Sequence, residues 1–531
     1  MIASGSTPKP DLMYAGTGDV PFIKVYNLTH RGVLDFSIKP TFIDRSTHNG
    51  LLARSRAVPN DVLINIVGPP LGKVSIVPKD FPEWNINQAI VLFRPRSGVL
   101  SKYLAFAFLD ESIMRRVTSR AKATAGQSNI GVGMCRNFLP VPLAPTSEQR
   151  RIVAKIEELF SDLDAGVAAL ERAKANLKRY RASVLKAAVE GQLTAEWRAK
   201  QKNLEPASKL LERILAERRQ KWEADQLAKF AASGKPPPKN WQAKYVEPAP
   251  PDTTNLPQLP EGWCWARLGQ LLHGIEGGKS FKCLTRQATN DEWGVIKVSA
   301  MTWGVFIEDE QKAIPPSAEF NEKDEIRPGD LLLSRSNTTE LVGATVLVHE
   351  CRPRLLLSDK SLRLLVSGEL NRWWLLRTLQ SRIIRRQLSA MATGTSDSMR
   401  NVSQEKIESV VVPLSPRHEQ PVVDAFVSER LSQIDAAEQV IEHGLLRASR
   451  LRQSILKQAF EGKLVPQDPS DEPASVLLDR IRSGRLPSDQ SENLADENTE
   501  NAADGGSDSP KVGRTKSPRR LSGSASGRTK P

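Results

Sequence analysis

The sequence contains few cysteines and no long apolar run. Only four cysteines occur among 531 residues, and no two of them form a CxxC pair. Reduced thiols are typical of cytoplasmic proteins, so we expect this compartment. No apolar stretch approaches the roughly 18 residues that a membrane-spanning helix needs. The N-terminus also lacks the basic-then-apolar pattern of a signal peptide, so we expect no membrane partner.

Motifs of the common catalytic sites are also missing. HExxH, GxSxG and the Asn/Asp-Pro-Pro-aromatic tetrapeptide of amino-methyltransferases do not occur, and the six histidines are scattered. The stretch HGIEGGKS (273–280) ends like a phosphate-binding loop, but it is one residue too short between its glycines. We expect a flexible loop there instead. The sequence therefore predicts no catalytic residue and no metal site in this chain.

Acidic residues are outnumbered by basic ones. There are 75 Lys and Arg against 61 Asp and Glu, which gives a formal net charge of +14. Because neutralised phosphates supply much of the affinity for nucleic acid, this balance favours a polyanionic partner. On charge alone, an ordinary basic protein is an equally good interpretation.

The sequence contains similar stretches that lie about half the chain length apart. EPASKLLERI begins at Glu205, and EPASVLLDRI begins at Glu472. At an offset of 271, residues 142–193 align with 413–464 without a gap and 20 of 52 positions are identical. Average residue frequencies would give roughly three identities. Weaker matches follow upstream in the same order: FIKV with VIKV, PNDVL with PGDLL, and ATAGQSN with ATGTSD. The pattern predicts two copies of one unit, each a variable part followed by a preserved part.

The preserved parts predict two long helices. Apolar residues recur in steps of four and three from Ile152 to Ala187, and less regularly from Val423 to Gln458. This spacing is typical of a coiled-coil seam. Gly444 is a small residue at which a larger side chain of the first helix could pack. We expect the helices to pack on each other, antiparallel if a twofold axis relates the units. The alternative is two separate helices, each packed on its own domain.

The variable parts mix short β-type runs with helical stretches, which predicts compact α/β domains. The expected fold class is α+β/α, with two α/β domains separated by two long helices packed as an antiparallel, pseudo-twofold coiled coil. The expected boundaries are 1–140 for the first α/β domain, 141–193 for the first long helix, 194–258 for a helical extension and Pro-rich linker, 259–412 for the second α/β domain, 413–464 for the second long helix, 465–484 for a short helical extension and 485–531 for a disordered tail.

A preserved pattern, P(L)xPxxEQ…I…L…LK.A.EG.L, follows each α/β domain. It resembles the specificity subunit of type I restriction–modification systems. LPEGWCWARLGQL (259–271) and the FIKV, PGDLL and ATG landmarks look like the target-recognition domains of that family. The resemblance reaches to about residue 484. It implies that residues 1–140 and 259–412 each read one half of a bipartite, asymmetric target in double-stranded DNA, with the helices as a ruler between them.

The same resemblance implies the partners. Two DNA methyltransferase subunits and a restriction (motor-nuclease) subunit would assemble with this chain. S-adenosylmethionine, ATP and Mg²⁺ would be used by those subunits. The chain itself would be the non-catalytic specificity subunit of a DNA methyltransferase and type I site-specific deoxyribonuclease complex.

The first unit departs from this pattern at its start. Some 15 residues that correspond to the opening of the second unit are absent before MIASGSTP. Either the start codon is misplaced or the first domain lacks its opening strand.

Two sets of residues are expected to make the contacts. For base readout in the second domain we expect polar loop residues: Lys279, Arg335, Ser336 and Asn337. For docking of the methyltransferase subunits we expect charged helix residues that recur in both copies while the seam drifts. They are Arg179, Arg181 and Lys186 in the first copy and Arg450, Arg452 and Lys457 in the second.

Two other function classes stay open at this point. The chain could be a coiled-coil adaptor with two binding modules and no DNA contact. A self-contained DNA methyltransferase is a third interpretation, and the missing motifs oppose it.

Overall fold

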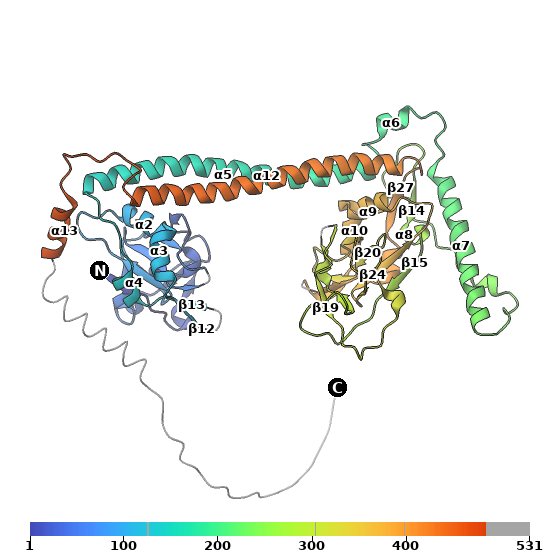
Figure 1. Cartoon of the computed structure of the whole chain (residues 1–531), viewed down its shortest axis with the longest axis horizontal. Helices are drawn as coiled ribbons and strands as arrows, with labels where there is room; N and C mark the ends of the chain where they lie inside the picture. Colours follow the sequence, from blue (N-terminus) through green and yellow to red (C-terminus); the bar gives the residue numbers. More distant parts are fainter. Residues whose placement is uncertain (69, 125–126, 303, 398, 485–531) are drawn as a thin grey trace, which may run out of the picture. The chain divides into compact units, whose positions relative to one another are not determined.

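The computed structural model describes residues 1–68, 70–124, 127–302, 304–397 and 399–484 (Figure 1). The chain divides into two compact units, each made of segments that are distant in sequence. Unit 1 contains residues 1–164 and the chain from 449 onward, and unit 2 contains residues 165–448. The tail expected over 485–531 lies outside the described residues. No helix in the described ranges is long and apolar enough to cross a membrane.

Unit 1 is built on two five-stranded sheets. Short apolar runs such as VLIN (62–65) and IVLF (90–93) form strands whose residues are all buried, because both faces of the sheet are covered. The first sheet has the order β1 (Ile2–Ser4), β11 (Ile90–Phe93), β7 (Val62–Asn65), β9 (Val74–Ile76), β4 (Gly32–Val33). The second has the order β2 (Tyr14–Ala15), β5 (Thr41–Ile43), β3 (Val20–Ile23), β10 (Trp84–Ile86), β6 (Arg56–Ala57).

Helices and a hairpin complete the α/β part of unit 1. Helix α2 (Ser101–Leu109) packs on the first sheet, and α3 (Glu111–Thr118) begins at Asp110, whose carboxylate accepts the N–H of Ser112. Strands β12 (Lys122–Thr124) and β13 (Gln127–Asn129) form a hairpin that pairs with β8 (Val67–Gly68). The shorter elements are η1 (Pro10–Leu12), η2 (Val25–Asn27), α1 (Arg45–Asn49), η3 (Ala53–Ser55) and α4 (Val132–Phe138).

Unit 2 repeats this order of elements. The sheet β15 (Leu272–Gly277), β24 (Ser361–Val366), β20 (Leu331–Ser334), β22 (Thr345–Leu347) corresponds to β1, β11, β7 and β9. A second sheet contains β19 (Gln311–Ala313), β16 (Gly294–Ile296) and β23 (Leu355–Leu356), and the hairpin β25 (Thr393–Ser396) and β26 (Met399–Asn401) pairs with β21 (Ser336–Asn337). Helices α9 (Arg372–Gln380) and α10 (Arg382–Met391) follow at the positions of α2 and α3. The order confirms the duplication.

The remaining elements of unit 2 are short, except for α7. They are α6 (Ala195–Ala199), α7 (Ala207–Ala232), η4 (Trp241–Lys244), β14 (Cys264–Arg267), α8 (Leu268–Leu271), η5 (Val298–Ala300), β17 (Met301–Thr302), β18 (Val305–Phe306), η6 (Glu322–Asp324), α11 (Gln404–Glu408) and β27 (Val411–Leu414).

The expectation of a flexible loop over residues 273–280 is wrong for most of that stretch. Residues 272–277 form β15, which pairs antiparallel with β24 so that Ile275 lies opposite Leu364. The glycines serve packing here, since a Cβ on Gly278 would lie 2.1 Å from the carbonyl oxygen of Leu357.

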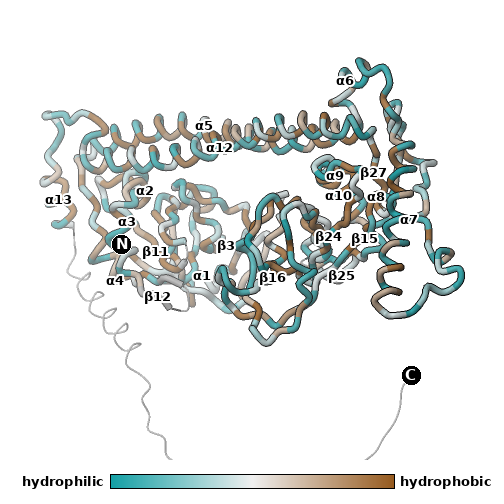
Figure 2. The backbone as a smooth tube through the Cα atoms, turned by 45° about the vertical axis from the view of Figure 1, so that its right-hand side comes forward, coloured by the Kyte–Doolittle hydropathy of each residue, from teal (hydrophilic) through white to brown (hydrophobic). Residues whose placement is uncertain are grey.

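The two predicted long helices are α5 (Thr146–Val189) and α12 (Gln420–Phe460). Apolar stretches recur along both (Figure 2). In unit 2 the segments of these helices run antiparallel, because Lys174 pairs with Glu442, and Arg181, seven residues later, pairs with Asp435, seven residues earlier. Gly444 receives a larger side chain as expected: a Cβ on this residue would lie 3.0 Å from Cδ1 of Leu170.

The seam within the helices differs from the predicted one. Tyr180 and Leu451 occupy equivalent predicted seam positions, yet they are 47% and 49% exposed. Leu185 and Leu456, outside the predicted seam, are buried. An α-helix with 3.6 residues per turn drifts by about 20° per heptad from a strict seven-residue repeat. The buried stripe therefore moves by about one residue over the length of the helix.

The EPAS repeat marks two equivalent helices that pack on the units. In unit 2 it begins α7, whose Ala207, Leu210 and Ile214 are buried in the core. In unit 1 it begins α13 (Ala474–Ser483), whose Leu477 is 1% exposed. A Cβ on Gly98 would lie 2.4 Å from Cδ1 of Leu477, so the glycine makes room for this helix.

Candidate nucleic-acid interface

A repeated aspartate–arginine pair fixes the frame of each α/β part. In unit 1 Arg94 donates two hydrogen bonds of 2.8 Å to Asp61, and in unit 2 Arg363 donates from Nε to Asp330 at 2.9 Å. These hydrogen bonds raise the pKa of Arg94. Each aspartate also accepts a backbone N–H three residues earlier at 2.9 Å. The PNDVL and PGDLL landmarks are therefore turns that anchor β7 and β20, and they are structural.

Arg335 lies directly after β20 in unit 2. Its N–H donates to the carbonyl of Lys360 at 3.0 Å, and its carbonyl accepts from Val402 at 2.9 Å. Lys279 lies on the other side of the same segment, because its carbonyl accepts the N–H of Asp359 at 3.1 Å. The structure thus places Lys279 and Arg335 on either side of residues 358–360.

These basic side chains are available to a ligand. Lys279 is exposed, and Arg335 and Lys360 are half-buried. Within the described part of the chain, none of the three makes a side-chain hydrogen bond or an ion pair. Sequence reasoning missed Lys360; its position just before the apolar run SLRLLV, at the end of a turn, was the available signal.

The other two predicted readout residues lie next to them in β21. Ser336 is 5% exposed, and its hydroxyl hydrogen-bonds the side chain of Asn401 in β26. Asn337 is half-buried, and its Oδ1 accepts the N–H of Thr338 at 2.9 Å. Ser336 therefore joins two strands, whereas Asn337 keeps part of its amide accessible.

The hairpin that pairs with β21 adds another cation. Asn337 lies opposite Arg400 of β26, and Arg400 donates to the carbonyls of Ala392 and Gly394 at 3.0 and 3.2 Å. Met399 at the same hairpin is 43% exposed. In unit 1 the equivalent hairpin, β12–β13, lies on the side away from α5 and α12 (Figure 1).

Equivalent positions in unit 1 have the same backbone and different chemistry. Ile66 donates its N–H to the carbonyl of Ala89 at 2.8 Å and accepts from Ile130 at 2.9 Å, as Arg335 does with Lys360 and Val402. Ile66, at the position of Arg335, is 7% exposed. The two units share the backbone hydrogen bonds at these positions and differ in the side chains there.

Two of the predicted docking residues, Arg181 and Arg452, also take part in helix pairing. Arg181 forms ion pairs with Asp435 and Glu438 of the facing helix, and Arg452 forms one with Asp164. The offset from Arg181 to Arg452 and from Asp164 to Asp435 is 271 in both cases. Each of these pairs joins the segments of α5 and α12 that belong to one unit. Helix pairing thus gives both arginines a structural role, and their part in docking stays a prediction.

The other four predicted docking residues stay on the surface. Arg179, Lys186, Arg450 and Lys457 are exposed. The two lysines lie 3.6 and 3.8 Å from the glutamates four residues later, which are weak surface pairs. The exposed Tyr180 and Leu451 lie beside them in the sequence. Their role in docking stays a prediction.

The described residues contain no group of three or more His, Cys, Asp or Glu side chains that could hold a metal ion.

Comparisons with known proteins agree with these features. No family model matches the chain. The chain is 26% identical over 369 residues to the type I restriction enzyme EcoEI specificity subunit of Escherichia coli, covering 61% of this chain and 59% of that relative. It is 24% identical over 411 residues to the EcoKI specificity subunit of Escherichia coli strain K12, covering 75% of this chain and 74% of that relative.

A solved structure supports the fold. A chain from work on complex assembly and conformational transition of the type I R-M system superposes with a TM-score of 0.56 at 18% identity, over 87% of this chain and 95% of that one. The sequence comparisons supply the relationship, and the superposition supplies the arrangement of α/β domains and long helices. The chain is a homologue of the type I restriction enzyme specificity subunits.

Proposed function

We propose that this chain reads a bipartite, asymmetric sequence in double-stranded DNA and recruits methyltransferase and restriction subunits to it. The proposal rests on one observation: equivalent backbone positions of the two units carry different side chains. Arg335 and Lys360 in unit 2 stand where unit 1 has Ile66 and Ala89. Two readers of one design but different chemistry suit a target with two unlike halves.

The chemistry of unit 2 suits a DNA duplex. Lys279, Arg335 and Lys360 have no acidic partner within the described ranges, so neutralising them with phosphates breaks no ion pair. An arginine can also make a bidentate contact to the O6 and N7 atoms of guanine. Asn337 beside it is a side chain that can contact adenine in the same way.

The long helices suit the spacing of two half-sites. DNA offers similar surfaces to two readers that are related by an approximate twofold axis and lie about a helical turn apart. Arg181 pairs with Asp435 in unit 2, and Arg452 pairs with Asp164 in unit 1, so each unit holds its own segments of α5 and α12 together. A rigid helix pair would then fix the length of the spacer.

Enzymatic steps would belong to partner subunits. The names of the curated relatives describe subunits of restriction enzymes, so the proposal extends to a methyltransferase and a motor-nuclease partner. S-adenosylmethionine, ATP and Mg²⁺ would bind to those partners. The exposed basic residues Arg179, Lys186, Arg450 and Lys457 are the proposed docking surface on this chain.

Selection from a randomised duplex library tests the proposal. The full chain is mixed with the methyltransferase subunits of the same host, and bound DNA is sequenced. We expect two unlike motifs at a constant separation. If no sequence is enriched while the subunits still assemble, the chain is an adaptor without DNA specificity.

A further inference from the structure

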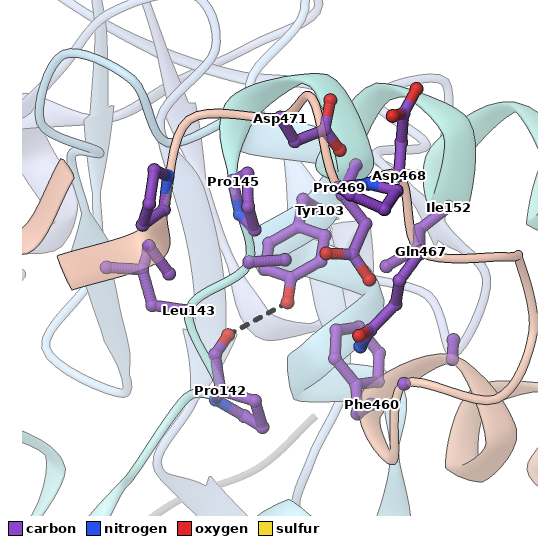
Figure 3. A pocket seen from close by; sticks show the side chains of 16 residues that line it. Tyr103, Pro142, Leu143, Pro145, Ile152, Phe460, Gln467, Asp468, Pro469 and Asp471 are labelled. Carbon is purple, nitrogen blue, oxygen red and sulfur yellow. Dashed lines mark hydrogen bonds between the residues drawn. The ribbon is translucent and has the colours of Figure 1, made fainter. Parts of the chain in front are cut away.

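Unit 1 contains a cavity of about 410 Å³ between the start of α5 and the end of α12 (Figure 3). Tyr103 of α2 lies in its wall and donates its hydroxyl proton to the carbonyl of Pro142 at 2.8 Å. The ring of Tyr103 also packs on Phe460, the last residue of α12, with 5.3 Å between the ring centroids. These contacts join α2 to the segment before α5 and to the end of α12, so the cavity belongs to a structural joint. A surface without such a role lies in unit 2, at the far end of α7.

Helix α7 is anchored in unit 2 by its first half. No residue of α7 after Ile214 is buried. Arg218 donates from Nε to the carbonyl of Leu272, the first residue of β15, at 3.0 Å. Residues 219–232 continue the helix for about 21 Å beyond this bond, at a rise of 1.5 Å per residue. The second half of α7 therefore projects from the core of unit 2 (Figure 1).

Residues 233–246 fold back onto this projecting half through aromatic side chains. Trp241 stacks on Trp222 with 5.8 Å between the ring centroids, and Tyr245 packs on the same ring at 5.4 Å. Arg218 donates to the hydroxyl of Tyr245 at 3.1 Å. Three consecutive prolines in this loop also restrict its backbone. The loop is thus held against α7, although it adds nothing to the core of unit 2.

We call residues 219–246 the α7 extension; they contain six basic and two acidic residues, a net charge of +4. The two acidic residues are engaged: Glu223 pairs with Arg219 at 3.2 Å, and Asp225 pairs with Lys221 at 3.9 Å. The other four basic residues are exposed lysines, and within the described part of the chain none of them makes a side-chain hydrogen bond or an ion pair. They are Lys229, Lys235, Lys239 and Lys244.

The strand beside α7 leads to the proposed readout residues. Strand β15 begins at Leu272, which α7 holds, and ends at Gly277, two residues before Lys279. The far end of α7 and strand β25 lie on the same side of unit 2, away from α5 and α12 (Figure 2). A duplex bound to Lys279 and Arg335 would therefore lie on the side toward which α7 projects. Unpaired lysines on a folded loop suit the phosphates of such a duplex, because their neutralisation releases counterions.

We propose that the α7 extension is a second DNA-binding element of unit 2, which holds phosphates next to the half-site without reading bases. The inference rests on the proposed function, because it requires a duplex on the readout residues of unit 2. A lysine binds phosphate as a point charge and lacks the planar fork with which arginine recognises guanine. The α7 extension would therefore add affinity for DNA of any sequence and leave the recognised motif unchanged.

The salt dependence of duplex binding by the full chain tests the α7 extension. The triple variant Lys235→Gln, Lys239→Gln, Lys244→Gln removes three charges of the loop. At about 0.1 M salt we expect it to bind a duplex of random sequence about tenfold or more weakly. The slope of log K against log[salt] should become shallower by about 2–3, because each phosphate contact contributes about 0.9. The motif selected from a randomised library should stay the same.

Two further triple variants serve as controls. Arginine at the same three positions keeps the charge, so it should keep the affinity and the slope of the unchanged chain. A matched set on the long helices of unit 2 removes three exposed charges on the side away from β25 and should leave DNA binding unchanged: Arg172→Gln, Lys178→Gln and Arg447→Gln. Circular dichroism and thermal unfolding establish that all variants are folded.

Unchanged affinity and slope in the glutamine variant would overturn the inference and leave the two recognition domains of the proposed function standing. A changed motif would show that the lysines contact bases, which also overturns it. Unchanged DNA binding with weaker assembly of the methyltransferase subunits would show that the α7 extension docks protein instead. A full chain that binds no duplex would overturn the inference and the proposed function together.

Discussion

Gln149 and Gln420 each join a long helix to its α/β domain. Both are fully buried. Oε1 of each accepts the N–H of a residue just before α2 or α9, Leu100 or Asn371, at 2.9 Å. Nε2 of each donates to a carbonyl five residues earlier in the chain. The sequence shows that the Glu-Gln pair recurs. It does not show that each glutamine anchors a helix, because the contacts that do so involve residues distant in sequence.

Removing either glutamine should destabilise its own unit only. Gln149→Ala removes the partner of the Leu100 N–H and of the Ala144 carbonyl, which are both partly buried, so we expect a loss of about 1–3 kcal/mol of folding free energy. Hydrogen exchange should accelerate at the N–H of Leu100 in this variant and at that of Asn371 in Gln420→Ala. The exposed Gln439 gives the control Gln439→Ala, which should change neither. Faster hydrogen exchange at both amides in either single variant would contradict the claim that each glutamine anchors only its own unit.

Arg335 allows a test of base readout in one domain. Arg335→Ala should cost about 1–3 kcal/mol of discrimination at one base pair of one half-site, because a bidentate contact to that base is lost. Motif selection with the variant measures this. Arg327, which is 72% exposed, gives the control Arg327→Ala. Equal weakening for all sequences would show that Arg335 contacts phosphate instead.

At the scale of elements, the helices were the most predictable part. Their lengths and their mutual packing follow from the heptad spacing, and Gly444 was expected to receive a larger side chain. The exposure of Tyr180 and Leu451 could not be predicted. It depends on how far the buried face of a straight helix shifts, over several turns, from a strict seven-residue repeat. The sequence did not predict strand β15, because its pairing partner β24 is distant in sequence.

Two helix glycines should respond in opposite directions to larger residues. A leucine at Gly444 would overlap Leu170, so we expect Gly444→Leu to cost about 1–3 kcal/mol of folding free energy. Gly166 has no atom within 4 Å of a built Cβ, so Gly166→Ala should stabilise by about 0.5–1 kcal/mol. Thermal unfolding of both variants measures this. A stable Gly444→Leu protein would show that the helices do not pack closely there.

Matched insertions test whether the helices set the spacing. Seven residues placed after Ala169 in α5 and after Leu446 in α12 keep the register and the buried faces, since seven residues are nearly two turns. They add about 10 Å, or roughly three base-pair steps of 3.4 Å. We expect unchanged half-sites with a longer spacer. The insertion in α5 alone should break the pair of Arg181 with Asp435 and abolish activity. An active double insertion with the original spacer would contradict the ruler.

At the scale of the whole molecule, the internal repeat explains which contacts the two units share and at which positions their side chains differ. The Asp–Arg pairs, the glutamine anchors and the reciprocal helix contacts recur because each does the same structural work twice. Arg335 and Lys360 stand where unit 1 has Ile66 and Ala89, and Ile66 is buried in the core of unit 1. Sequence alone could predict the duplication and the fold class. It could not show that Lys279, Arg335 and Lys360 lie close together, since Lys279 and Lys360 come near Arg335 only through backbone pairing.

The most direct measurement is the methylation pattern of the host genome with the gene intact and with the gene deleted. We predict that deletion removes methylation from one motif, made of two unlike half-sites at a fixed separation. Replacing residues 259–412 with a homologous domain should change one half and leave the other half and the spacing intact. Loss of a continuous, palindromic motif would contradict the claim that the chain carries two different recognition domains. Loss of no motif, while the partner subunits are expressed, would contradict it as well.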